Sequence, residues 1–216
     1  KLRELQKELP SFCSDFFRGI ETSTSTRTRI AYAYDLKIFF QFLKTANPGT
    51  FDNPSHTLTP SDLEKLTVTD LEEYIDYLKC HPSDTNEDVI NTERGLMRKV
   101  SSLRSFYSYF FRNERIEKNP AALVRMPKLH EKEIIRLEID EVAKLLDEVE
   151  EGDKLTEKQK LYHERTKVRD LAMMSLLLGT GIRVSECVGL NINDIDLDTC
   201  GARVYRKGGK ESVIYF

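Results

Sequence analysis

The chain has 216 residues, 39% of them hydrophobic and 32% charged, with a formal net charge of −3. At roughly 100 to 200 residues per domain this length favours two modest domains, and the balanced composition excludes a disordered acidic or basic tail. No apolar run approaches the roughly 20 residues that cross a bilayer, and the N-terminus KLRELQKELP has no signal-peptide core, so we expect a cytoplasmic protein without a membrane partner.

Helical periodicity predicts most elements in the first third of the sequence. The apolar positions from Leu2 to Phe16 recur at helical spacing, although the proline within this stretch restarts or kinks the first helix. The run ETSTSTRTR is rich in N-cap residues and precedes a second helix over about 26–45. The proline-rich stretch 47–60 predicts a loop, after which Thr69 can cap a short helix that ends at Lys79. The polar segment HPSDTNED predicts another loop.

The segment 90–113 predicts an amphipathic helix whose two faces differ in chemistry. One stripe is apolar and aromatic, and the opposite face carries arginine and serine at 100° per residue. From Arg94 to Arg112 the sequence has five basic residues and no acidic one, whereas 62–76 is mainly acidic. Because charge is segregated along the chain, this helix face can bind phosphates although the net charge is negative.

A change of pattern near residue 127 predicts a domain boundary. Asn-Pro and Met-Pro steps break the helical pattern there and begin a connector, PKLHEKEIIRLEID, which we interpret as the linker between domains 1–127 and 128–216. Beyond it, 139–149 is amphipathic, and a helix rich in lysine and glutamate runs into the apolar stretch LAMMSLLLG. We expect the charged segment EEGDKLTEKQKLYHERTK to be exposed and the apolar stretch to be buried core.

The end of the sequence changes to glycine turns and strand patterns. A Gly-Thr-Gly turn at 179–181 leads into a short helix that ends near Gly189. Residues 202–206 and 212–216 then flank KGGK, which predicts a β-hairpin. The two glycines of KGGK supply the positive φ that a two-residue hairpin turn requires.

Cysteine and histidine positions indicate neither disulfides nor a metal site. The four cysteines are far apart, form no C-x-x-C pair and have no histidine at metal-ligand spacing. We therefore expect reduced, buried thiols and no bound metal. No catalytic or ligand role is assigned to the isolated histidines, which are His56, His81, His130 and His163.

Arg183, Glu186 and Lys207 form a candidate phosphate site. An arginine at a helix start presents a planar, charged fork beside free backbone N–H groups, which suits a phosphate oxyanion. Glu186 can hold that fork in place, and a hairpin lysine can donate a proton to a leaving oxygen. The structural alternatives are a surface Arg183–Glu186 pair and a solvated turn lysine, with Lys210 as an equally exposed rival.

The strings LLLGTGIRVSECVGLNINDIDL and RKGGKESVIYF resemble the first catalytic block of tyrosine recombinases, in their Xer-like and phage integrase branch. In that family the arginine of a G-[LI]-R-x-S-E motif binds the scissile phosphate, the following acid supports the site, and a turn lysine is a general acid. By this resemblance Arg183, Glu186 and Lys207 take those roles. Arg206 stands where the family often has glycine.

The N-terminal half resembles the core-binding domain of the same family. Residues from Thr28 to Leu36 match its T-x3-Y-x2-D-L pattern, RKVSSLR at 98–104 matches its basic helix, and Asn119-Pro120 resembles its N-P linker. The resemblance implies a mainly α fold, with a SAM-like domain of four to five helices followed by a partial α+β catalytic domain containing a β-hairpin or small antiparallel sheet. The residues expected to contact DNA are Thr28, Arg29, Arg94, Arg98, Lys99, Ser101, Ser102, Arg104 and Lys210.

The resemblance also implies what the sequence lacks. The family completes its site with H-x-x-R, a further histidine or tryptophan, and a tyrosine nucleophile, and we interpret Tyr205 and Tyr215 as sheet residues. We therefore expect a fragment, monomeric in solution, that binds double-stranded DNA and cleaves nothing. The complete enzyme would act as a tetramer on DNA through a 3′-phosphotyrosyl intermediate, with no cofactor and no catalytic metal.

Plainer interpretations remain for several of these residues. A charged helix face is ordinarily solvated surface, Arg104 lies off the main stripe, and Thr28 and Arg29 can equally cap a helix. A second functional hypothesis is a non-catalytic helical DNA-binding or regulatory protein on the same scaffold. A type IB topoisomerase has similar active-site logic, but the N-terminal half here resembles the recombinase branch.

Overall fold

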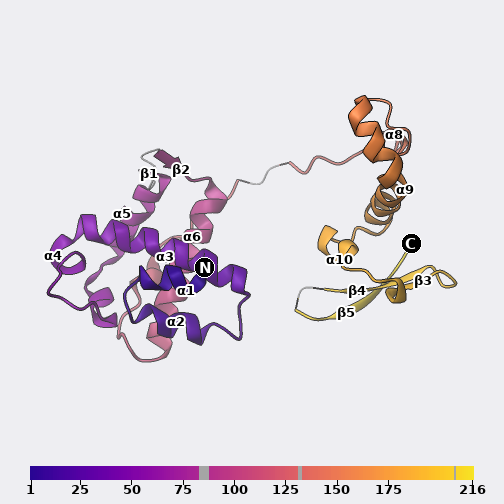
Figure 1. The fold of residues 1–216 in the computed structure, drawn as a ribbon. Coiled ribbons are helices and arrows are strands. Elements are labelled where there is room, and N and C mark those ends of the chain that lie inside the picture. The colour runs from indigo at the N-terminus through magenta and orange to yellow at the C-terminus, as the bar shows by residue number, and fades with distance from the viewer. Residues whose placement is uncertain (83–87, 131–132, 207) are drawn as a thin grey trace. The chain divides into compact units, whose positions relative to one another are not determined.

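The protein is mainly helical and has two small antiparallel sheets, as Figure 1 shows, which confirms the predicted fold class. The structure, a computed structural model, describes residues 1–82, 88–130, 133–206 and 208–216. The chain divides into two compact units, Lys1–Lys132 and Glu133–Phe216. The linker pattern in the sequence placed the boundary slightly earlier, between residues 127 and 128.

The first unit is built from helices and one short hairpin. The proline at position 10 separates the first two helices, as predicted. Two features were missed: a short helix within the predicted loop 47–60, and strands β1 (Cys80–Pro82) and β2 (Asp88–Ile90) on either side of residues 83–87. The helices are α1 (Leu2–Lys7), α2 (Cys13–Gly19), α3 (Thr26–Ala46), α4 (Pro48–Phe51), the 3-10 helix η1 (Pro60–Lys65), α5 (Val68–Lys79), α6 (Glu93–Arg112) and α7 (Pro120–Leu123).

Serine and threonine side chains cap the N-termini of the long helices of this unit. Ser25 accepts a hydrogen bond from the backbone N–H of Thr28 at the start of α3, and Thr92 accepts one from Gly95 at the start of α6. Helix α5 begins at Thr67, whose hydroxyl accepts from the backbone N–H of Asp70. The predicted cap at Thr69 was therefore wrong by two residues, because Thr67 and Asp70 form a reciprocal capping box.

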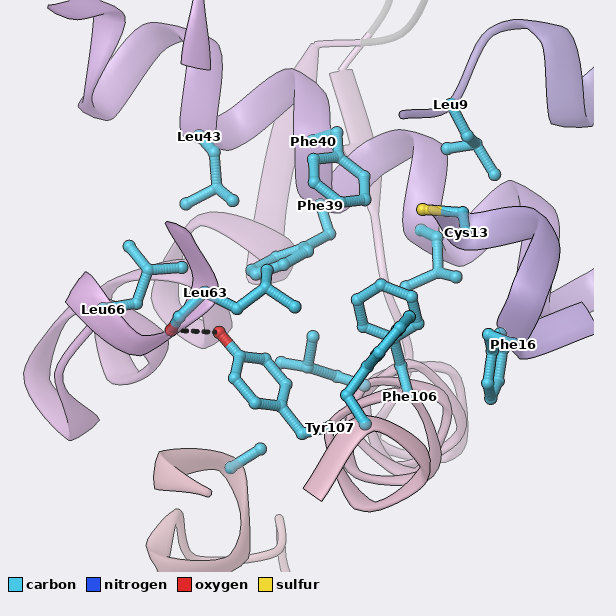
Figure 2. Close-up of a cluster of buried hydrophobic side chains, with 14 of the residues drawn as sticks. Leu9, Cys13, Phe16, Phe39, Phe40, Leu43, Leu63, Leu66, Phe106 and Tyr107 are labelled. Carbon is cyan, nitrogen blue, oxygen red and sulfur yellow. Dashed lines mark hydrogen bonds between the residues drawn. The ribbon is translucent and has the colours of Figure 1, made fainter. Parts of the chain in front are cut away.

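Aromatic side chains fill the core of the first unit (Figure 2). Phe106 of α6 is fully buried and lies against Phe16 of α2 and Phe40 of α3, with ring centroids 5.2 and 6.2 Å apart. The hydroxyl of Tyr107 donates to the backbone oxygen of Leu63 at 3.3 Å, which ties η1 to α6. Full burial of each such side chain stabilises the fold by about 1.5–3 kcal/mol, so α6 is the central packing element of this unit.

The second unit combines three helices with a small sheet. Its helices are α8 (Ile139–Glu151), α9 (Glu157–Thr180) and α10 (Val184–Val188), followed by the 3-10 helix η2 (Ile192–Asp194). Gly152 and Gly181 follow α8 and α9 with φ of 70° and 64°, the left-handed conformation that glycine adopts without strain. The strands β3 (Ile195–Asp196), β4 (Gly201–Tyr205) and β5 (Glu211–Tyr215) form one antiparallel sheet in that order.

The predicted β-hairpin is confirmed, but both strands lie one residue earlier than expected and the turn is longer. Strands β4 and β5 pair from Gly201 opposite Tyr215 to Tyr205 opposite Glu211. The backbone N–H of Arg206 then donates to the oxygen of Lys210 at 2.7 Å. Gly208 and Gly209 do have positive φ, 91° and 77°. The turn nevertheless lies between Arg206 and Lys210, so it is not a two-residue turn.

The core of the second unit is small. Only Ile182, Cys187 and Val204 form its buried apolar cluster among the described residues, with partly buried side chains of α9 packed against it. No described residue of α9 is fully buried, so the prediction that LAMMSLLLG is buried core was wrong. One face of α9 meets the cluster through Met173, Leu176 and Leu177, and the remaining apolar side chains of that stretch stay partly or fully exposed.

The cysteines correct one further expectation. Cys13 and Cys187 are buried, whereas Cys80 and Cys200 are exposed, and all four are free. Cys80 begins the short strand β1, and Cys200 lies in the turn before β4 with a φ of 49°. The side chains of Cys80 and Cys200 are therefore exposed to solvent, which the spacing of cysteines in the sequence does not reveal. None of the helices that the structure describes is long and apolar enough to span a membrane.

A buried carboxylate organises the segment before α5. The side chain of Asp62 is 3% exposed and accepts hydrogen bonds from Lys65 at 2.7 Å and from the backbone N–H of Thr59 at 2.9 Å. His56 lies 2.9 Å away on the same carboxyl group. Burial by itself raises the pKa of Asp62, but these hydrogen bonds outweigh it and lower the pKa from 3.8 to about 2.

Replacement of this aspartate, Asp62→Asn, should make the stability of the protein less dependent on pH. A pKa that is lower in the folded state contributes stability above the unfolded value and loses it as the pH falls. We expect the variant to lose about 2 kcal/mol at pH 7, and the gap to close between about pH 4 and pH 2. Urea unfolding at several pH values measures it. A constant gap, or one equal to that of the exposed control Asp76→Asn, contradicts the assignment.

Candidate functional site

Arg183 and Glu186 form the best-defined polar pair of the second unit. Gly181 ends α9, and Arg183 follows as the residue before α10. One carboxylate oxygen of Glu186 accepts from the backbone N–H of Arg183 at 3.0 Å, and the other accepts from its Nη1 at 2.7 Å. The carboxylate is only 3% exposed, whereas the arginine side chain is 63% exposed. The buried carboxylate of Glu186 therefore holds the exposed guanidinium of Arg183 in position.

Glu186 is an ionised carboxylate at neutral pH. The hydrogen bond from the backbone N–H of Arg183 lowers its pKa most, and the hydrogen bond from the Arg183 guanidinium lowers it further. Helix α10 has only five residues, and the N–H at its start is already used by Glu186. The guanidinium of Arg183 is the charged group that is available to an anion here.

Arg206 is a neighbour of this pair that the sequence analysis did not place in the site. Its Nη1 lies 3.8 Å from Glu186 Oε2, and its side chain is 41% exposed. The sequence marked Arg206 only as a departure from a family pattern. Nothing local connects a residue at the end of β4 with one on α10, because only tertiary packing brings these two segments together.

The structure places the other predicted residues of the hairpin only in part. Lys207, the predicted general acid, lies outside the described residues. Lys210 is exposed, and its backbone oxygen accepts from Arg206. Tyr205 and Tyr215 lie on β4 and β5 and are 52% and 70% exposed, as expected of sheet residues.

The cationic face of α6 is exposed at both ends. The side chains of Arg94 and Ser101 are exposed, and the hydroxyl of Ser101 donates to the backbone oxygen of Met97 at 2.8 Å. Arg98 is 45% exposed, and its Nη1 donates to the carboxylate of Asp35, which is almost fully buried on α3. Burial raises the pKa of Asp35, and the charge of Arg98 partly offsets that rise. Arg98 therefore joins α6 to α3 while keeping part of its fork at the surface.

Lys99 and Ser102, two of the predicted DNA contacts, are buried. Lys99 is 8% exposed and donates to the side chain of Asn91 at 2.8 Å. Burial lowers the pKa of Lys99, an effect that the charge of Asp35 opposes. Ser102 is 0% exposed, and its hydroxyl has no hydrogen-bond partner among the described residues. Neither side chain is presented to a ligand on the surface of α6.

Arg104 has a structural role in the first unit. Its Nε donates to the backbone oxygen of Ala121 at 3.1 Å, and its Nη2 donates to those of Ala122, at 3.4 Å, and Val124. These carbonyls lie at and beyond the end of α7, where backbone oxygens lack partners within the helix. The guanidinium therefore links α7 to α6. These bonds explain why Arg104 lies off the main basic stripe of α6.

Thr28 and Arg29 lie in the first turn of α3. The hydroxyl of Thr28 is 2.9 Å from that of the capping residue Ser25. Arg29 is only 12% exposed and pairs with Glu21 at 2.5 Å, while its Nε is buried without a partner among the described residues. The residue that caps α3 is Ser25, so the capping role that the sequence left open for Thr28 and Arg29 belongs to Ser25 instead. The partners of the two residues are structural, and Arg29 presents little of its charge at the surface.

The four histidines have local protein partners or ring contacts. His56 lies against Asp62, His130 against Glu93, and His163 against the backbone oxygen of Val149. His81 is stacked on a tyrosine ring with its centroid 5.2 Å away. Within the parts of the chain that the structure describes, no group of three or more histidine, cysteine or acidic side chains is arranged to hold a metal ion.

Comparison with known proteins finds relatives over most of the chain. Residues 135–216, which contain Arg183, Glu186 and Arg206, match the model of the phage integrase family. The chain is 35% identical to tyrosine recombinase XerC of Caldanaerobacter subterraneus subsp. tengcongensis, over 95% of its own length and 55% of that protein. Residues 135–216 therefore belong to the phage integrase family, and the chain as a whole is similar to tyrosine recombinases. A relative from Streptococcus uberis, tyrosine recombinase XerS, is 31% identical over 99% of the chain and 65% of that protein.

Solved recombinase structures share the fold. A lambda integrase dimer bound to a COC′ core site superimposes with a TM-score of 0.59 at 16% identity, over 95% of this chain and 61% of that one. XerH bound to a palindromic difH substrate gives 0.55 at 15% identity, over 87% and 47% of the two chains. At such identities the likeness shows the recombinase fold alone. The chain spans between about half and two thirds of the length of its curated relatives.

The structural role of Arg104 is testable by replacement. Arg104→Ala removes charge-assisted hydrogen bonds to three carbonyls, so we expect it to lower the free energy of unfolding by about 1.5–3 kcal/mol. Arg104→Lys should recover less than half of that loss, because an ammonium lacks the planar fork. Urea unfolding measures both. The control Arg112→Ala, on an exposed position of the same helix, should stay within about 0.5 kcal/mol of the parent. Equal effects of Arg104→Ala and Arg112→Ala contradict this role.

Proposed function

We propose that this chain is the DNA-binding and phosphate-binding part of a site-specific DNA recombinase or integrase. The observation that carries the proposal is the exposed Arg183 guanidinium, anchored by the buried carboxylate of Glu186 within the region that matches the integrase family. Such a fork can donate two parallel hydrogen bonds to a phosphate, and its charge does not depend on pH. The relatives from Caldanaerobacter subterraneus subsp. tengcongensis and Streptococcus uberis are themselves named tyrosine recombinases, which supports the same function.

The proposed reaction is a transesterification at a backbone phosphate of DNA. A tyrosine oxygen attacks the phosphorus, a 3′-phosphotyrosyl bond forms, and a 5′-hydroxyl leaves with the proton that a general acid donates. Arg183 stabilises the negative charge that develops on the phosphate oxygens, and Glu186 keeps the guanidinium in position. By its place in the sequence, Lys207 is the proposed general acid. Neither Tyr205 nor Tyr215 is the proposed nucleophile.

DNA binding is assigned to surface groups of both units. On α6 the proposed phosphate contacts are Arg94, the exposed part of Arg98, and Ser101, because these three side chains share one exposed face. Thr28 and Lys210 are kept as further candidates, whereas Lys99, Ser102, Arg104 and Arg29 are not. The complete protein is proposed to assemble as a tetramer on DNA, and residues 1–216 alone to be monomeric in solution.

A salt titration tests the proposed DNA contacts. Binding of residues 1–216 to a short duplex should weaken linearly on logarithmic axes as salt rises, with a slope of about −0.9 per neutralised phosphate. Arg94→Ala should reduce the magnitude of that slope by about 1. The control Lys79→Ala removes one charge from α5, where the lysine is paired with Asp76, and should leave the slope unchanged. Fluorescence anisotropy measures both. Binding that is insensitive to salt contradicts the proposal.

Strand cleavage tests the catalytic assignment. In the full-length protein, Arg183→Ala should reduce the covalent protein–DNA adduct on a nicked duplex by about 10²–10³-fold, because it removes a donor to the developing charge. Residues 1–216 alone should give no adduct. Denaturing gels with labelled duplex measure both. Normal cleavage by Arg183→Ala excludes the proposed role, and a full-length protein that binds DNA without cleavage supports the non-catalytic alternative.

A further inference from the structure

The carboxylate of Glu186 has two arginine partners that come from different elements. Arg183, before α10, donates to Oε1 at 2.7 Å, and Arg206, at the end of β4, lies 3.8 Å from Oε2. Among the ion pairs of the described residues, this is the only acidic partner of either arginine. Two guanidinium charges against one carboxylate leave a net positive charge at one surface position. Both guanidiniums lie within 4 Å of the same carboxylate, so an anion beside that carboxylate would be attracted by both charges.

The backbone fixes where Arg206 can reach. The β4–β5 pairing ends at Tyr205 and Glu211, directly before Arg206. The backbone N–H of Arg206 donates to Lys210, and its backbone oxygen accepts from Gly209 at 3.1 Å. Strand β4 is anchored below by the buried side chains of Ala202 and Val204. The backbone of Arg206 is therefore held in place by hydrogen bonds, which limits where its side chain can reach.

We propose that Arg206 is a second phosphate-binding residue, which together with Arg183 forms a two-arginine clamp on one phosphate, with Glu186 between the two forks. The inference rests on the proposed function, because it takes a phosphate at Arg183 as given. Each guanidinium uses one edge toward Glu186 and is 63% or 41% exposed, so donors remain for a ligand on both. The shared carboxylate reduces the repulsion between the arginines when the phosphate is absent.

A purely structural role for Arg206 makes different predictions. If the residue only neutralises Glu186, its removal should change the stability of the second unit and leave anion affinity unaltered. If it only adds positive charge, any neighbouring arginine should count equally. Arg203 offers the matched control, because it lies on the same strand, is exposed, and carries the same charge.

Titration with inorganic phosphate tests the clamp directly. Residues 1–216 are labelled with ¹⁵N-arginine, and the Nε–Hε signals are followed by NMR at constant ionic strength. In the parent protein, the signals of Arg183 and Arg206 should shift together with one dissociation constant. Arg206→Ala should raise that constant about tenfold, the size expected for a lost charge-assisted hydrogen bond. Arg203→Ala should change it less than about twofold, since an exposed charge that makes no direct contact with the phosphate is largely screened.

The outcomes separate this inference from the function on which it rests. If Arg183 responds to phosphate and Arg206→Ala binds as tightly as Arg203→Ala, the clamp is wrong and the Arg183 site stands. If neither arginine signal responds, the proposed phosphate site fails as well. Arg206→Lys, which keeps the charge but not the fork, decides the case if Arg206→Ala unfolds the second unit. Full affinity in Arg206→Lys overturns the proposal of a second fork.

Discussion

The buried carboxylate of Glu186 is the constraint on which the site depends. It is almost inaccessible to solvent, and it can remain ionised there because Arg183 supplies both a backbone and a side-chain donor. The same bonds fix the direction in which the guanidinium points. A guanidinium held at the surface by a buried carboxylate loses little side-chain freedom when an anion binds, which is the condition for a pre-organised site.

The first unit uses a comparable arrangement for a different purpose. Asp35 of α3 is buried and is paired with Arg98 of α6, so an ion pair joins the two long helices next to an aromatic core. Arg98 pairs with the buried carboxylate of Asp35 and is still 45% exposed, so it has a structural partner and a surface-exposed part. Lys99 and Arg104 form hydrogen bonds inside the first unit, with Asn91 and with the carbonyls near α7. Some of the basic residues of α6 therefore stabilise the first unit through hydrogen bonds and ion pairs with other segments.

Much of the fold could be predicted from periodicity and capping. The long helices, the break at the first proline and the two faces of α6 depend on interactions within a few residues of each other, and the glycines of the β4–β5 turn marked the hairpin, though not its register. The errors share one cause. Thr69 competed with an equally good cap two residues away, the apolar end of α9 found too few partners to be buried, and two cysteines lie at turns and strand starts. Each depends on neighbours that a local pattern does not specify.

The site was predictable to the same extent. The sequence by itself determined Arg183 and Glu186 as a pair, because a spacing of three residues at a helix start brings the two side chains together. Only the tertiary structure decided that Arg206 joins them, that Lys99 and Ser102 are inside, and that Arg104 bonds to α7. The physical reason is that these outcomes depend on contacts between segments far apart in the chain, and packing, not spacing, determines which face of a residue meets solvent.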